Sequence, residues 1–121
     1  MAELCRTSPL AIALDEELIG IHTSEEMDRL LDTVRPQYIV LKPSLVGGLG
    51  AGMWMESARK YGVGYWITSA LESNIGLNAI AQLCSYHGCT DMPQGLGTGL
   101  LFTDNVPVPL KIEGDKLFFR E

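Results

Sequence analysis

The sequence has few basic residues, few cysteines and no long apolar run, and each absence excludes a class of protein. Nine lysines and arginines stand against fifteen aspartates and glutamates, which gives a formal net charge of −6. A nucleic-acid or anionic-membrane partner would need a basic surface, so we expect neither. No segment approaches the roughly 20 apolar residues of a membrane span, and the first ten residues lack a signal-peptide pattern.

The three cysteines are an odd number, and no two of them have the CxxC spacing. We therefore expect no disulfide framework, and a reducing cytoplasm is the natural setting. Cys84, His87 and Cys89 are close together, but no second pair of ligands accompanies them. One cysteine on a helix face and two residues near the end of that helix explain this cluster better than a metal site does.

Apolar runs that predict strands alternate with segments of helical periodicity, in a chain long enough for one core. The expected strands span residues 10–14, 38–41 and 64–69. Thr23 and Glu26 form a capping box before the first helix, and a glycine-rich turn at residues 47–50 leads into the second. After residue 101 the rhythm ends, and residues 110–119 predict a β-hairpin around Gly114.

Polar residues recur at one spacing along the chain. Lys42 follows Asp15 by 27 positions, Ser69 follows Lys42 by 27, and the next step reaches Leu96. A (β/α) barrel of about 250 residues in eight units has a similar period, and its active site lies at the carboxyl ends of the strands. An open α/β sheet could produce the same pattern, but the barrel is favoured.

The candidates for chemistry stand at these strand ends. Asp15 is a carboxylate of the kind that Mg²⁺ prefers, although a lone strand-end Asp is more often a cap or turn former. Lys42 suits a base, a Schiff-base former or a fixed cation, with a lysine that extends into solvent as the ordinary alternative. The segment that begins at Thr68 offers hydroxyl and N–H groups that suit a substrate carboxylate and helix capping alike. Glu16, beside Asp15, is expected to support the site or pair with a neighbour.

Four motifs occur in one order: IALDEELIG, VLKPSLVGGL, ITSALESNIGL and PQGLGTGLLFTDN. In order and spacing they resemble the o-succinylbenzoate synthases of the enolase superfamily, from about Pro9 through the closing PLKIEGDKLFF. Each motif alone is weak, but four in register are specific. The resemblance implies an α/β fold, the C-terminal half of a (β/α)7β barrel. Strands five to eight would lie in residues 1–105, and residues 106–121 would return to a cap domain.

The resemblance also implies roles for individual residues. Asp15 matches the third of three acidic Mg²⁺ ligands, and Lys42 matches a lysine that faces the substrate opposite a second lysine. Thr68, Ser69 and Leu71 would help to hold the succinyl part of the substrate, and Gly95 and Leu96 would form the pocket wall. Such enzymes dehydrate 2-succinyl-6-hydroxy-2,4-cyclohexadiene-1-carboxylate to o-succinylbenzoate in menaquinone synthesis. The intermediate is an enediolate, which a divalent cation and a fixed Lys42 cation would stabilise.

Several parts of the family pattern have no counterpart in this chain: the KxK segment that holds the second lysine, two metal ligands and most of the cap domain. Met1 falls where the preceding barrel helix would be under way, so we expect a truncation there. We expect the chain alone neither to bind Mg²⁺ tightly nor to turn over substrate. Its expected partner is the missing N-terminal half of the barrel with the cap domain, or a second copy of itself.

Three other functions stay open. Dipeptide epimerases and N-acylamino acid racemases would use Lys42 as an acid/base, but the TSA and TDN runs favour the synthase. A non-catalytic half-barrel that self-associates is a second alternative, because half a barrel leaves two open strand edges. A Schiff-base aldolase that uses Lys42 is a third, disfavoured because Pro43 and the SALES run match the enolase relatives better.

Overall fold

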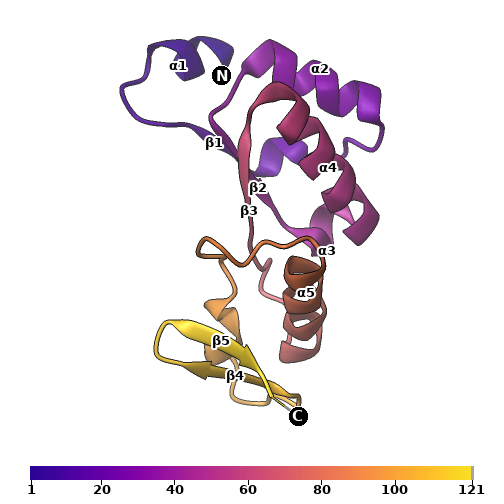
Figure 1. Cartoon of the computed structure of the whole chain (residues 1–121), viewed down its shortest axis with the longest axis vertical. Helices are drawn as coiled ribbons and strands as arrows, with labels where there is room; N and C mark the ends of the chain where they lie inside the picture. Colours follow the sequence, from indigo (N-terminus) through magenta and orange to yellow (C-terminus); the bar gives the residue numbers. More distant parts are fainter. Residues whose placement is uncertain (121) are drawn as a thin grey trace.

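The computed structural model describes residues 1–120, and its centre is a parallel sheet of three strands in the order β1-β2-β3 (Figure 1). The strands are β1 (Ala13–Leu14), β2 (Tyr38–Leu41) and β3 (Gly64–Ile67). The longer helices are α2 (Ser24–Val34), α4 (Gly48–Tyr61) and α5 (Asn74–Tyr86). Short helical segments complete this part: α1 (Ala2–Thr7), η1 (Glu16–Leu18) and α3 (Pro43–Val46). The expected alternation of strand and helix is confirmed.

Local signals in the sequence set the ends of the helices. Thr23 is the N-cap of α2: its Oγ1 accepts the N–H of Glu26 at 3.3 Å and donates to the Glu26 carboxylate at 3.0 Å. Gly62 ends α4 in the left-handed conformation, with a φ of 67°. The expected turn at residues 47–50 is wrong in extent, since α4 already begins at Gly48 and Gly47 alone there has a positive φ.

The first strand is shorter than residues 10–14 because its partner limits it. β2 begins at Tyr38, which pairs with Ala13, so residues 10–11 have no strand beside them. Ile12 instead donates its N–H to the side-chain oxygen of Gln37 at 2.8 Å. The carbonyl of Ile12 accepts the N–H groups of Gln37 and Tyr38, each at 3.1 Å.

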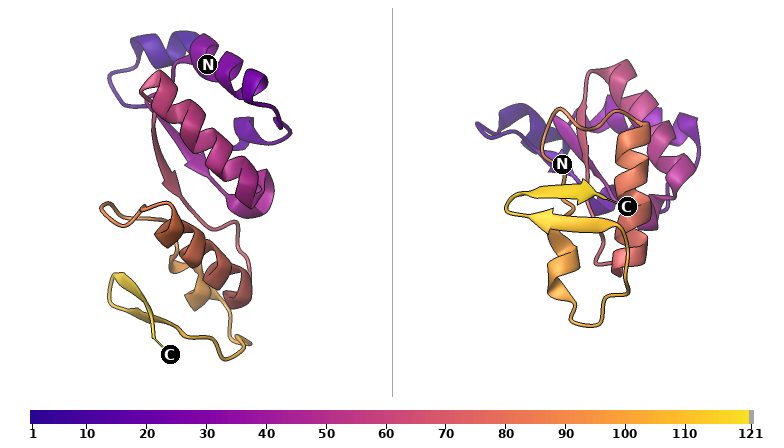
Figure 2. Two further views of the ribbon diagram at one scale, coloured as in Figure 1. Left: turned by 45° about the vertical axis from the view of Figure 1, so that its right-hand side comes forward. Right: turned by 60° about the horizontal axis from the view of Figure 1, so that its bottom comes forward.

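One face of the sheet carries the core. α2 and α4 lie side by side on this face (Figure 2), and the strand side chains turned toward them are fully buried. They are Leu14, Ile39, Leu41 and Ile67. Alternation turns Ala13, Tyr38 and Trp66 to the opposite face, where the rings of Tyr38 and Trp66 lie 5.8 Å apart.

The fourth strand position is reduced to a single parallel bridge between Thr68 and Gly95. Beyond it the chain forms the 3-10 helix η2 (Gly97–Leu101) rather than a strand through Leu96. The Gly95 N–H donates to the Ile67 carbonyl at 2.8 Å, and the Gly95 carbonyl accepts the Ser69 N–H at 3.0 Å. Two main-chain bonds thus continue the sheet for one residue.

The C-terminal segment forms the expected hairpin, β4 (Leu110–Glu113) and β5 (Lys116–Phe119), with Gly114 at a φ of 64° in the turn. The side-chain amide of Asn74, at the start of α5, exchanges two hydrogen bonds with the main chain of Val106 and fixes the approach to the hairpin. Glu121, the last residue of the expected segment 106–121, lies outside the described residues. No described helix is long and apolar enough to cross a membrane.

Candidate active site

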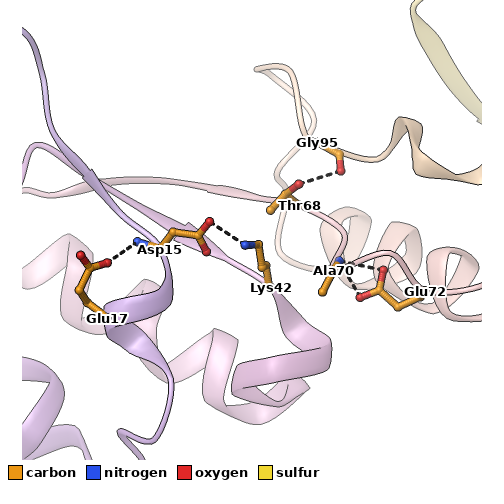
Figure 3. A network of polar contacts seen from close by, with 7 residues as sticks. All are labelled: Asp15, Glu17, Lys42, Thr68, Ala70, Glu72 and Gly95. Atoms are coloured by element: carbon orange, nitrogen blue, oxygen red, sulfur yellow. Dashed lines mark hydrogen bonds and ion pairs between the residues drawn. The ribbon is translucent and has the colours of Figure 1, made fainter. Parts of the chain in front are cut away.

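Asp15 and Lys42 form an ion pair at the carboxyl ends of β1 and β2 (Figure 3). Lys42 Nζ lies 2.6 Å from Asp15 Oδ2. The lysine side chain is 20% exposed and the aspartate 40%, so both groups are sheltered but reachable. The two residues that stand 27 positions apart in sequence are therefore neighbours at the same edge of the sheet, as the spacing predicts.

The neighbouring main chain orients this pair. Asp15 leaves β1 for η1, and its N–H donates to the carboxylate of Glu17 at 3.1 Å. The neighbour that contacts Asp15 is thus Glu17 rather than Glu16. Lys42 is the N-cap of α3, whose first residue is Pro43. The fixed φ of proline suits a helix start, so the chain turns immediately after Lys42.

Thr68 and Gly95 form the next contact along the same edge of the sheet. Thr68 Oγ1 donates to the Gly95 carbonyl at 3.0 Å. A Cβ on Gly95 would overlap Thr68 Oγ1 and come within 2.7 Å of Thr68 Cβ. Only glycine fits here, because the two segments approach more closely than a side chain permits.

Ser69 and Leu71 lie in the loop that joins β3 to α5. Ser69 is buried, and its hydroxyl oxygen accepts the Leu71 N–H at 3.0 Å and lies 2.6 Å from the hydroxyl of Thr98. The Leu71 side chain is 63% exposed, and its φ is 66°. The hydroxyl of Ser69 is therefore engaged within the protein, while Leu71 presents an apolar side chain to solvent.

Leu96 lies away from the ion pair. It packs against the core and lines a cavity of about 890 Å³ between α5 and the hairpin, together with Cys84, Cys89 and Phe118. Neither Asp15 nor Lys42 lines this cavity. The structure thus brings Asp15, Lys42, Thr68 and Gly95 to one edge of the sheet and places Leu96 beyond it.

The donor set at this edge suits part of a magnesium site. Asp15 supplies the carboxylate oxygen that Mg²⁺ prefers, and it remains partly exposed. Among residues 1–120, no three His, Cys, Asp or Glu side chains gather closely enough to hold a metal ion. A magnesium site built on Asp15 would therefore need further ligands from outside the described residues.

The chain is similar in sequence and in structure to an o-succinylbenzoate synthase. No family model matches the chain. Over 118 residues it is 60% identical to the o-succinylbenzoate synthase of Desulfotalea psychrophila LSv54, a match that covers 97% of this chain and 32% of that protein. The crystal structure of MenC from the same organism superposes with a TM-score of 0.87 at 59% identity, covering 96% of this chain and 32% of that one.

The resemblance to o-succinylbenzoate synthase is confirmed. The chain spans about one third of the length of that relative and matches its C-terminal part. Muconate lactonizing enzyme from Pseudomonas putida has a TM-score of 0.79 at 21% identity, covering 96% of this chain and 32% of that one. This more distant likeness shows the fold alone.

Sequence reasoning assigned no role to two residues at this edge, Glu72 and Ser44. The Glu72 carboxylate accepts the Ala70 N–H with both oxygens, at 2.8 and 3.0 Å, and also accepts the hydroxyl of Ser44. The periodicity gives no sign of them, because each lies beyond a strand end. A carboxylate inside the SALES loop was the one available signal.

Proposed function

We propose that this chain forms part of a Mg²⁺-dependent o-succinylbenzoate synthase, a lyase of menaquinone biosynthesis. The observation that carries the proposal is the Lys42–Asp15 pair, with 2.6 Å between Nζ and Oδ2 at the carboxyl edge of a parallel sheet. The 60% identity to an o-succinylbenzoate synthase supports the choice of reaction. Because the chain spans one third of that relative, the activity belongs to the complete protein.

In this proposal Lys42 is a fixed cation. Removal of the proton beside the substrate carboxylate produces an enediolate. The neighbouring hydroxyl would then leave as water, taking a proton back from the same base, and its loss completes the aromatic ring. The ammonium group of Lys42 would lower the energy of the negative charge without accepting the proton. The base that accepts it would be the second lysine of the family pattern, which this chain does not contain.

Asp15 would hold the Mg²⁺ together with carboxylates outside this chain. When bound, the ion would stabilise the charge that develops on the substrate carboxylate. Asp15 suits this role because it is a partly exposed carboxylate beside Lys42. The same carboxylate would keep Lys42 aligned with the substrate.

We propose that Thr68, Ser69, Leu71, Gly95 and Leu96 shape the pocket. Thr68 and Gly95 hold the end of β3 through their hydrogen bond. Ser69 holds the loop that follows β3, and Leu71 in that loop is exposed. Leu96 packs against the core. Residues 1–105 would form barrel strands five to eight, and residues 106–121 would contact a cap domain.

We further propose that the remaining two thirds of the relative is the partner of this chain. In the described residues, β1 pairs with β2 alone, which leaves one sheet edge open, and Tyr38 on the uncovered face is 39% exposed. Mixed with the remaining two thirds of the Desulfotalea protein, the part that this chain does not span, the chain should sediment as a one-to-one complex. Assembly of the chain with itself alone would favour the self-associating half-barrel.

The complex of this chain with the remaining two thirds of the Desulfotalea protein, called the complemented protein below, tests the substrate. We expect it to dehydrate the cyclohexadiene carboxylate, which absorbance measurement of o-succinylbenzoate detects. In D₂O, it should exchange the α-hydrogen of an N-acylamino acid or a dipeptide far more slowly. Faster exchange than dehydration would instead favour a racemase or epimerase, in which Lys42 acts as an acid/base.

A further inference from the structure

Glu72 joins two loops at the carboxyl edge of the sheet. Its two carboxylate oxygens accept the Ala70 N–H at 2.8 and 3.0 Å (Figure 3). The Ser44 hydroxyl donates to the same carboxylate. Ser44 lies in α3, two residues after Lys42, and Ala70 lies in the loop after β3. One side chain thus connects the segment that holds Lys42 to the segment that holds Leu71.

The loop that Glu72 holds is strained. Leu71 has a φ of 66°, a left-handed conformation that costs free energy for any residue other than glycine and persists only where the surroundings enforce it. The Leu71 N–H donates to Ser69 Oγ, and the preceding Ala70 N–H donates to Glu72. Hydrogen bonds on both sides of the peptide therefore hold Leu71 in this conformation.

Helix α5 supports Glu72 from the other side. A Cβ on Gly76 would lie 2.7 Å from Glu72 Cβ and 3.1 Å from its Cγ. Burial raises the pKa of the Glu72 carboxyl, but the hydrogen bonds from Ser44 and Ala70, together with the nearby Ser69 hydroxyl, outweigh this effect and leave the pKa below its ordinary value. The carboxylate is therefore charged at neutral pH and confined between α5 and the loop.

The loop presents a side chain rather than its main chain. The N–H groups of Ala70 and Leu71 donate to Glu72 and Ser69, so they are occupied within the loop. The exposed group is the isobutyl side chain of Leu71. An apolar surface of this kind suits the methylene groups of an aliphatic chain on the substrate.

We propose that Glu72 is a positioning residue: it holds Leu71 in its left-handed conformation in the loop that follows β3, so that Leu71 contacts the methylene groups of the substrate. The identity of the substrate rests on the proposed function. The positioning of Leu71 by Glu72 rests on the hydrogen bonds of the loop alone. Glu72 itself touches no reacting atom. It acts through Ala70 and Leu71 on one side and through Ser44 on the other.

The first test measures the loop without any substrate. In an NMR titration of the isotopically labelled chain, the Ala70 amide resonance should follow the ionisation of Glu72, with a midpoint below the ordinary glutamate range. Because the folded-state pKa is lowered, the contact is present at neutral pH and is lost as the pH falls through this midpoint. The core amide of Ile39 reports whether the fold itself persists.

The same spectra report the conformation of Leu71. Its positive φ gives a strong cross-peak between its own amide and α protons, which Glu72→Ala should abolish and Glu72→Gln, which keeps one acceptor oxygen, should partly retain. Glu25→Gln, an exposed substitution on α2, is the matched control. An Ala70 resonance that ignores Glu72, or an unchanged Leu71 signal in Glu72→Ala, would overturn the proposal.

The second test uses the chain complemented by the remaining segment of the Desulfotalea protein. Glu72→Ala should raise KM about tenfold while kcat changes less than about threefold, since binding of the non-reacting chain is lost. Glu72→Gln should restore part of the KM. A loss of kcat alone would contradict the assigned role. If unsubstituted protein makes no o-succinylbenzoate, the proposed function fails, and the NMR experiment still decides whether Glu72 positions the loop.

Discussion

Lys42 Nζ and Asp15 Oδ2 lie 2.6 Å apart at the ends of two parallel strands, although the two residues are 27 positions apart in the sequence. The pair combines a cation and a carboxylate at one edge of the sheet, where neither is fully exposed. A partly exposed ion pair contributes only about 0–1 kcal/mol to stability. Stability alone therefore gives little reason for its presence, which favours a chemical role.

Lys42→Ala should separate stability from activity. We expect its free energy of unfolding in urea to change by less than about 1 kcal/mol, because the pair is partly exposed. In the complemented protein, the rate of o-succinylbenzoate formation should fall by at least about a hundredfold, as for loss of a transition-state donor. Lys60→Ala is the control, since Lys60 pairs with Asp28 on the helices and should leave the rate unchanged. Equal losses in both variants would contradict the role of Lys42.

Asp15→Asn should weaken magnesium binding by the complemented protein. Loss of one charged ligand is expected to raise the dissociation constant at least about tenfold, because affinity follows the charge of the ligands. Isothermal titration calorimetry with Mg²⁺ measures this change. Asp32→Asn, at an exposed position of α2 that pairs with Arg35, should bind as the unsubstituted protein does. An unchanged affinity in Asp15→Asn would remove Asp15 from the metal site.

Gly95→Ala should destabilise the chain. Its Cβ would come within 2.7 Å of Thr68 Cβ, so the end of β3 and the segment beside it must separate. Overpacking of this kind typically costs about 1–3 kcal/mol, which urea unfolding measures. At Gly97, by contrast, nothing lies within 4 Å of an added Cβ, and Gly97→Ala should change stability little. Equal stability of the two variants would show that the bridge at Gly95 is looser than described.

The cysteine thiols should react slowly in the folded chain. Cys5, Cys84 and Cys89 are free and buried, and burial raises the pKa of Cys84 to about 11. Since the thiolate is the reacting form, Cys84 should react with Ellman's reagent at pH 8 about a hundredfold more slowly than a small thiol. In urea all three should react at the ordinary rate. Rapid reaction of Cys84 without denaturant would mean that the hairpin side of α5 opens readily.

The sequence predicts the features that depend on local pattern. The apolar run Tyr38–Leu41 forms β2 with the expected limits, and Thr23 begins a helix as expected. The spacing between Asp15 and Lys42 predicts their contact, because residues at equivalent strand ends are neighbours in a parallel sheet.

Features that depend on pairing between distant segments are harder to predict. The length of β1 follows from where β2 begins, and the fourth strand is reduced to Gly95 because the chain turns into η2 at Gly97. The role of Glu72 could not be predicted, because its three hydrogen bonds depend on a loop conformation in which Leu71 has a positive φ. No periodicity encodes such a contact.

The most direct test of the proposed function is o-succinylbenzoate formation, followed by ultraviolet absorbance with Mg²⁺ present. The chain alone should give no turnover, and addition of the remaining segment of the Desulfotalea protein should produce turnover that Lys42→Ala abolishes. Turnover by the chain alone, or complemented turnover that survives Lys42→Ala, would contradict the assignment of an incomplete site built on Asp15 and Lys42.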